Sequence, residues 1–175
     1  GEKIKKDNIT AITNKKDAEK LQKELQEFKE ISISSIKTSE RKLKPKAPFK
    51  TASLQQAAYS TLSFSVKQTS AIAQRLYQGV DLGDGETVGL ISYMRTDSTT
   101  LSDDCLNDIN SFLKKEHPKF LSKEIRIYSK KVKNSQEAHE AIRPTSINNT
   151  PDKVKKYLEE NDFKLYELIW KRTVA

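Results

Sequence analysis

Tyr93 and Arg95 are two side chains whose types and spacing could act together on a phosphate, in the stretch GLISYMRTDSTTLS from Gly89 to Ser102. A phenol has a pKa of about 10, so a tyrosine nucleophile needs a positive charge or a base beside it at neutral pH. On an extended strand, residues two positions apart point to the same face, so the guanidinium could hold phosphate oxygens while the phenolate attacks phosphorus. A lone tyrosine on such a segment is more often a packing residue, and the pair by itself leaves both interpretations open.

Other kinds of catalytic site find little support in the sequence. His139 is followed by Glu140, but the second histidine of a zinc-binding helix, one turn further on, is missing. With one cysteine, Cys105, the chain can form neither an internal disulfide nor a thiolate metal cluster. The sequence also contains no glycine-rich phosphate loop and no Gly-x-Ser-x-Gly elbow, which argues against nucleotide hydrolysis and a serine nucleophile.

Positive charge is concentrated in the first part of the chain. The formal net charge is +8, and residues 1–50 hold fourteen Lys and Arg against eight Asp and Glu. A second basic run, KEIRIYSKKVK, extends from Lys123 to Lys133. Such patches attract a phosphate backbone, but a solvated lysine-rich surface explains them equally well. No apolar run approaches the roughly 18 residues that cross a bilayer, so we expect a protein without a membrane span.

The first fifty residues predict one helix and one strand. Asn14 with Asp17 indicates a helix start, and the following apolar residues share one face: Ala18, Leu21, Leu25 and Phe28. Alternating isoleucines predict a strand over 31–37, and the proline-containing stretch KLKPKAPFKT then indicates a boundary.

Two short helices are predicted next, over 54–78. Ser53 with Gln56 and Ser65 with Gln68 are both patterns of a helix start, and the second helix should end near Gly79. Residues at helical spacing should form their buried faces: Leu54, Ala57, Ala58, Leu62, Val66, Thr69, Ile72, Ala73 and Leu76. The pair is superficially similar to a helix-turn-helix, but an ordinary helical hairpin is the more common structure.

The rest of the chain predicts a turn, an extended run and further helices. Asp84-Gly85 is typical of a tight turn that would deliver residues 90–94 in extended form. Ser102 should cap a helix with acidic residues in its first turn and basic residues before Pro118. Thr150-Pro151 predicts another helix start, with a helix continuing to 158, and a final helix carries Phe163, Leu165, Leu168, Ile169 and Trp170.

The stretch GLISYMRTDSTTLS resembles the active-site segment of the bacterial type IA DNA topoisomerases. Three further segments, APFKTASLQQAA, FSVKQTSAIAQRLYQGV and SQEAHEAIRPT, are similar to segments of that family in the same order. The resemblance covers most of residues 44–175. Because several motifs occur in the same order, the probability of chance agreement is very small.

The resemblance implies roles for particular residues. Tyr93 would form a 5′-phosphotyrosine bond with DNA during single-strand cleavage, and Arg95 would orient and neutralise the cleaved phosphate. Asp97 and His139 match a coupled pair beside the cleaved backbone, in which His139 would contact phosphate. The strand-binding surface would be lined or supported by Thr96, Ser98 and Arg143, with Glu140 behind it.

The resemblance also implies the architecture. We expect a mainly α protein with a minor β part, in which residues 1–50 are part of a β-rich arch and hinge. Residues 51–150 would form the helical domain that carries the tyrosine, and residues 151–175 would be helices that return toward the arch. The chain begins at Gly1 and ends within a helical pattern at Ala175, which favours a multidomain fragment of a larger enzyme.

The implied enzyme is an ATP-independent isomerase that cleaves and religates one DNA strand to relax negative supercoils, in the bacterial cytoplasm. Its partners would be a single-stranded segment of DNA and the remaining domains of the parent chain. The family binds Mg²⁺ through an Asp-x-Asp-x-Glu pattern that is missing here, so we expect the ligands of the metal to lie outside these residues and the fragment alone to be inactive in relaxation.

Two alternatives remain open. One is a DNA-binding helical module without catalytic function, built on the helix pair at 54–78 and the basic runs. The other is a structural helical fragment whose charge serves only solubility.

Overall fold

The structure is a computed structural model that describes residues 12, 14–27, 33, 35–40, 44–83, 85–122, 124–128 and 139–175. It divides into two units, Gly1–Lys42 and Leu43–Ala175, each of which is described by itself. In the described ranges the fold is mainly helical with one two-stranded antiparallel sheet, as the sequence predicts.

The first unit contains helix α1, Lys15–Gln26. Its start is the predicted one, because the side chain of Asn14 accepts a hydrogen bond of 2.9 Å from the backbone N–H of Asp17. The helix buries no residue within its unit. Of the strand expected over 31–37, positions 33 and 35–37 have no regular structure, and the other positions lie outside the described residues, as does Phe28.

Helices α2, Thr51–Leu62, and α3, Val66–Gln78, form the hairpin that the sequence predicts. Ser65 caps α3 as expected, but α2 begins at Thr51, so that Ser53 lies in the first turn and accepts the backbone N–H of Lys50. The hairpin is a core element, because both helices pack against the final helix of the chain. Val66, expected on the buried face, is exposed.

The small sheet pairs β1, Val80–Asp81, with β2, Thr87–Val88, in antiparallel register. The predicted turn at Asp84-Gly85 lies partly outside the described residues, and Gly85 has the positive φ of 77° that such a turn requires. The extended run expected over 90–94 is not a regular strand. Only Ile91 pairs, in a single bridge to Pro144, because the neighbouring backbone is a loop and a helix end rather than another strand.

Of the remaining predicted caps, Ser102 accepts the backbone N–H of Cys105, whereas the side chain of Thr150 makes no cap hydrogen bond. Helix α4 covers Asp103–Glu116 and is followed by the short 3₁₀ helix η2, Pro118–Phe120. Thr150 precedes α5, Pro151–Val154. The predicted helix does not continue to 158 as one α-helix, because the next turn is the 3₁₀ helix η3, Lys155–Tyr157. Helix α6, Glu160–Val174, carries the final apolar face.

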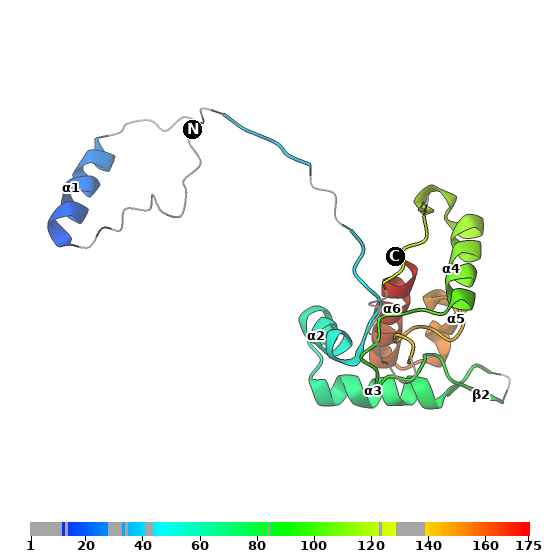
Figure 1. Ribbon diagram of the computed structural model, residues 1–175. Coiled ribbons are helices and arrows are strands. Elements are labelled where there is room, and N and C mark those ends of the chain that lie inside the picture. Colours follow the sequence, from blue (N-terminus) through cyan, green and yellow to red (C-terminus); the bar gives the residue numbers. More distant parts are fainter. Residues whose placement is uncertain are drawn as a thin grey trace, which may run out of the picture. The chain divides into compact units, whose positions relative to one another are not determined.

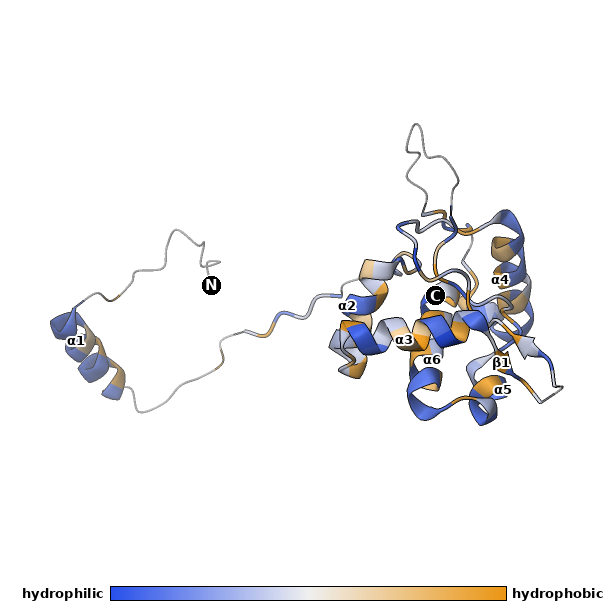
Figure 2. Cartoon of the chain, turned by 90° about the horizontal axis from the view of Figure 1, so that it is seen from below, coloured by the Kyte–Doolittle hydropathy of each residue, from blue (hydrophilic) through white to orange (hydrophobic). Residues whose placement is uncertain are grey.

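Helix α6 is central to the core of the Leu43–Ala175 unit (Figure 1). Its side chains Leu165, Tyr166 and Ile169 are fully buried against residues of α2 and α3. Figure 2 shows hydrophilic residues interleaved with hydrophobic ones on α3 and α4, as in helices that bury one face. A second, smaller cluster joins α4 to α6, where the rings of Phe112 and Trp170 meet edge to face at 5.6 Å.

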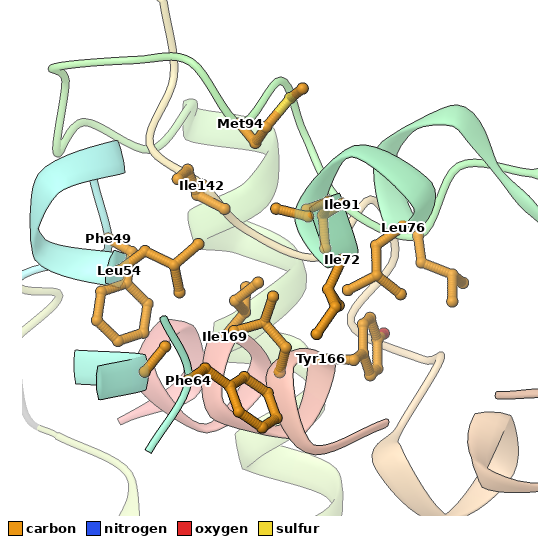
Figure 3. Packing of buried hydrophobic residues seen from close by; sticks show 14 of the residues in the cluster. Phe49, Leu54, Phe64, Ile72, Leu76, Ile91, Met94, Ile142, Tyr166 and Ile169 are labelled. Carbon is orange, nitrogen blue, oxygen red and sulfur yellow. The ribbon is translucent and has the colours of Figure 1, made fainter. Parts of the chain in front are cut away.

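The stretch around Tyr93 contributes to this core. Figure 3 shows Ile91 and Met94 among the side chains of the main cluster, together with Ile142. Within the part of the chain that the structure describes, no helix has both the length and the apolar character needed to cross a membrane.

Candidate active site

The loop that carries Tyr93 is anchored by its neighbours on both sides. Leu90 and Ile91 are fully buried, and Met94 is nearly so. The backbone N–H of Leu90 donates to the last turn of α3, at the carbonyl of Leu76, over 2.8 Å. Burial of the flanking apolar side chains therefore fixes the backbone on either side of Tyr93, although no sheet supports it.

A second segment, residues 139–145, lies against this loop. The backbone N–H of Ser92 donates to the carbonyl of Arg143 over 2.8 Å. The hydroxyl of Ser92 donates to the carbonyl of Ala141 over 2.7 Å and accepts from the backbone N–H of Arg143 over 3.0 Å. One serine thus joins two stretches of chain that are far apart in sequence.

Thr51, at the start of α2, holds the other side of the loop. Its hydroxyl donates to the carbonyl of Met94 over 2.7 Å and accepts from the backbone N–H of Thr96 over 2.9 Å. The backbone N–H of Thr51 also donates to the carbonyl of Thr96. Sequence reasoning missed both Thr51 and Ser92 as supports, although Thr51 lies in APFKTASLQQAA and Ser92 in GLISYMRTDSTTLS.

Tyr93 itself is accessible, with 41% of its surface exposed. Its ring lies between two others: Tyr77 meets it edge to face at 5.4 Å between centroids, and His139 is tilted against it at 6.1 Å. The structure therefore brings together Tyr93 and His139, two of the predicted site residues. Tyr77 is a neighbour that the sequence analysis did not single out, because nothing local relates the end of α3 to this loop.

Exposure alternates along the loop. Tyr93, Arg95 and Asp97 are exposed, whereas Met94 and Thr96 are buried. This alternation is typical of a strand, but here it occurs in an irregular segment. The buried residues are those that hydrogen-bond to Thr51 or pack in the core. Arg95 lines a cavity between α2 and α3, and no hydrogen bond or ring contact within the described residues joins it to Tyr93.

Glu140 connects the predicted site residue Arg143 to the start of α4. Its Oε2 accepts from Nε and Nη2 of Arg143, at 3.0 and 2.6 Å, and its Oε1 accepts the backbone N–H of Ser102 at 2.7 Å. Burial by itself raises the pKa of Glu140, but the hydrogen bonds from Ser102 and Arg143 outweigh it and lower the pKa below its ordinary value. The carboxylate is therefore ionised at neutral pH and keeps Arg143 in a fixed orientation.

The remaining predicted residues have different surroundings. Thr96 and Ser98 stabilise the loop, because Thr96 Oγ1 accepts from the N–H of Ser98 and Ser98 Oγ accepts from the N–H of Thr100. Asp97 and His139 are both described residues, and no hydrogen bond or ion pair joins them in this structure. Their coupling stays a prediction.

Comparison with known proteins identifies the family. The family model for DNA topoisomerase matches residues 1–175. The chain belongs to the bacterial type IA DNA topoisomerases. It is 52% identical over 166 residues to DNA topoisomerase 1 of Rickettsia felis, covering 94% of this chain and 21% of that protein.

Other relatives agree. DNA topoisomerase 1 of Campylobacter jejuni is 42% identical over 175 residues, which are 99% of this chain and 25% of that protein. The solved structure of full-length topoisomerase I from Thermotoga maritima is 44% identical, with a TM-score of 0.67, and the match covers 89% of this chain and 24% of that chain. The chain thus spans about a fifth to a quarter of the length of the topoisomerases that it matches.

Type IA topoisomerases use Mg²⁺. Across the described ranges, no group of three or more His, Cys, Asp and Glu side chains is placed to hold a metal ion. The described residues therefore do not fit a Mg²⁺ site.

Proposed function

We propose that this topoisomerase chain supplies the nucleophile and the adjoining phosphate contacts for cleavage and religation of one DNA strand, by which the whole enzyme relaxes negative supercoils. The observation that carries the proposal is the placement of Tyr93: an accessible phenol on a backbone fixed from both sides by buried neighbours, next to His139. Residues that only pack are usually buried, whereas residues that react must be exposed on a rigid support.

The proposed step is a transesterification. Tyr93 Oη attacks phosphorus and forms a phosphotyrosine ester with the 5′ side of the break, while the bond from phosphorus to O3′ breaks. The phenol loses its proton and the leaving 3′ oxygen gains one. One diester replaces another, so religation by the 3′ hydroxyl needs no ATP, in agreement with a sequence that lacks a nucleotide-binding loop.

Charged residues around Tyr93 suit a phosphate in this role. Arg95 follows two positions later and is exposed, so its guanidinium is free to hold phosphate oxygens. His139 contributes an imidazole beside the phenol, which would contact the same phosphate, with Asp97 as its proposed partner. Thr96 and Ser98 would support the loop that bears these groups, and Arg143 would line the surface held by Glu140.

We infer that these 175 residues alone do not relax supercoiled DNA. The relatives are four to five times longer, and the described residues hold no group of metal ligands. The rest of the enzyme would supply the Mg²⁺ ligands and the arch, and the enzyme would work on chromosomal DNA in the bacterial cytoplasm. One turnover of relaxation by the isolated chain would contradict this inference.

The test is formation of a covalent adduct. A full-length enzyme that contains this chain is incubated with a single-stranded oligonucleotide and Mg²⁺, denatured, and mapped by mass spectrometry. The expected result is an adduct on the peptide that contains Tyr93, and its loss in Tyr93→Phe. Tyr77→Phe is the matched control, because Tyr77 has nearly the same exposure and touches Tyr93 but should keep the adduct.

An adduct on another tyrosine, or none, would reject Tyr93 as nucleophile. Full cleavage activity in Tyr93→Phe would favour the alternative of a DNA-binding helical module.

A further inference from the structure

A cavity lies beside the loop of Tyr93, between helices α2 and α3. Its volume is about 300 Å³. Leu54, Ala73 and Met94 contribute apolar surface, and two glutamines, Gln55 and Gln74, also line it. A mostly apolar hollow with a few well-placed polar groups is the usual form of a site for a flat organic ligand.

The polar groups of this cavity are only partly used within the protein. Gln55 donates from Nε2 to Ser70 Oγ over 3.2 Å, which leaves its carbonyl oxygen available. Among the hydrogen bonds of the described residues, the side-chain amide of Gln74 takes part in none, and no buried side-chain nitrogen or oxygen lacks a partner. The amide of Gln74 is therefore accessible and offers both a donor and an acceptor.

Arg95 lines the same cavity. A guanidinium plane can stack on a flat aromatic ring, and an amide can form paired hydrogen bonds with the edge of a nucleobase. Arg95 is two residues from Tyr93, so their Cα atoms are at most about 7 Å apart. A nucleotide next to a phosphate at Tyr93 can therefore place its base at this cavity.

We propose that the cavity between α2 and α3 is a nucleobase subsite, which binds one unpaired base of the DNA strand next to the phosphate that Tyr93 attacks. The proposal deepens the proposed function and depends on it. The flat face of the Arg95 guanidinium stacks on the base while its N–H groups hold the phosphate, and the amides of Gln55 and Gln74 bind the edge of the base. A base within a duplex cannot enter, because its edge is already paired, so the subsite selects single-stranded DNA.

The experiment measures binding separately from cleavage. Full-length enzyme carrying Tyr93→Phe is titrated with single-stranded oligonucleotides, each with one base removed at a different position around the cleavage site. The expected result is one position, adjacent to the cleaved phosphate, where removal of the base weakens binding about 5- to 100-fold. Adding Gln74→Ala should weaken binding of the intact oligonucleotide. It should also abolish the difference in affinity between the intact oligonucleotide and the one that lacks the base at that position.

Matched glutamines on the same helices serve as controls. Gln56 on α2 and Gln78 on α3 are exposed and lie outside the cavity, so Gln56→Ala and Gln78→Ala should leave the position-dependent difference unchanged. Ser70→Phe is a second variant, which fills the cavity from an exposed position and should have the same effect as Gln74→Ala while keeping the Gln74 amide.

Two results would overturn the subsite. One is that removal of no single base lowers the affinity of the Tyr93→Phe enzyme for the oligonucleotide. The other is a Gln74→Ala enzyme that weakens intact and base-deleted oligonucleotides equally, since that is a general loss of affinity and not a lost base contact. Failure of the proposed function is seen separately, as the absence of a Tyr93 adduct in the unmodified enzyme, whatever the binding series shows.

Discussion

Glu140 binds Arg143 through one carboxylate oxygen and the first residue before α4 through the other. The two hydrogen bonds to Arg143 are 3.0 and 2.6 Å long, and the bond from the N–H of Ser102 is 2.7 Å. His139 precedes Glu140 directly and lies against Tyr93. The carboxylate is therefore the link between the helix start and the segment that positions His139.

Replacing Glu140 by Gln should make the protein less stable by about 1–3 kcal/mol at neutral pH, since hydrogen bonds from charged groups are lost. Burial alone would raise the pKa of Glu140, but the hydrogen bonds from Ser102 and Arg143 bring it below its ordinary value. The Glu140 carboxylate therefore contributes its full share of stability at a pH above the pKa that it has in the unfolded chain. This stability is lost as the pH falls through the lower pKa of the folded state. Urea unfolding between pH 3 and pH 7 measures this stability. The free energy of unfolding should decrease less on acidification in Glu140→Gln than in the parent protein.

Glu160→Gln is the control, because Glu160 pairs with Lys164 at a fully exposed site and should change stability little. Equal acid sensitivity of Glu140→Gln and the parent protein would show that the Glu140 contacts do not contribute.

Replacing Gly89 by Ala should displace the loop of Tyr93. A Cβ at this position would lie 2.7 Å from the carbonyl oxygen of Tyr77, which is backbone and cannot rotate away. The expected effect is a tenfold or greater loss of adduct formation, since displacements of about 1 Å have large effects on reaction geometry. Gly85→Ala is the comparison: a Cβ there meets nothing within 4 Å, although its φ of +77° adds strain. Similar adduct yields in the two variants would contradict the prediction.

Replacing Arg75 by Met should destabilise the contact between α3 and α6. Arg75 Nε donates to Asp162 at 3.0 Å, and Asp162 is buried. Without the arginine, the carboxylate would be buried and unpaired, which costs about 3 kcal/mol. Chemical denaturation gives the value, with Lys67→Met on the same helix as an exposed control. If both variants unfold at the same denaturant concentration, the pair does not stabilise the fold.

Replacing Tyr166 by Phe should reduce the sensitivity of the protein to alkali. Burial raises the pKa of Tyr166 well above its ordinary value, and its hydroxyl donates to the carbonyl of Asn149 at 2.6 Å. The unfolded phenol ionises near pH 10 while the folded one stays neutral, so stability falls as the pH rises above about 10. Unfolding free energies at pH 8 and pH 11 should differ less in Tyr166→Phe. Tyr59→Phe, at an exposed position, should behave as the parent protein does.

The helix starts were the most predictable part of the fold. Asn14, Ser65 and Ser102 cap helices where the sequence indicates, because a cap depends on hydrogen bonds within three residues. The predicted cap Ser53 lies three positions after the actual N-cap of α2, Lys50. The start of this helix depends instead on the hydrogen bonds of Thr51 to the distant loop at 94–96.

The extended run around Tyr93 was only half predictable. Its alternation of buried and exposed residues followed from the apolar pattern. Whether this run pairs as a strand depends on the backbone segment next to it. That segment is irregular and contains Pro144, which forms a single bridge with Ile91. A residue pattern cannot specify a partner that lies far away in the chain.

The sequence by itself determined the family, the helices and the candidate nucleophile, since linked motifs, helical spacing and end caps are all properties of neighbouring residues. Only the tertiary structure decided what surrounds Tyr93: the rings of Tyr77 and His139, and a cavity between two helices. The physical reason is that burial of Ile91 and Met94 pulls the loop onto the core, which brings together residues that no local pattern relates.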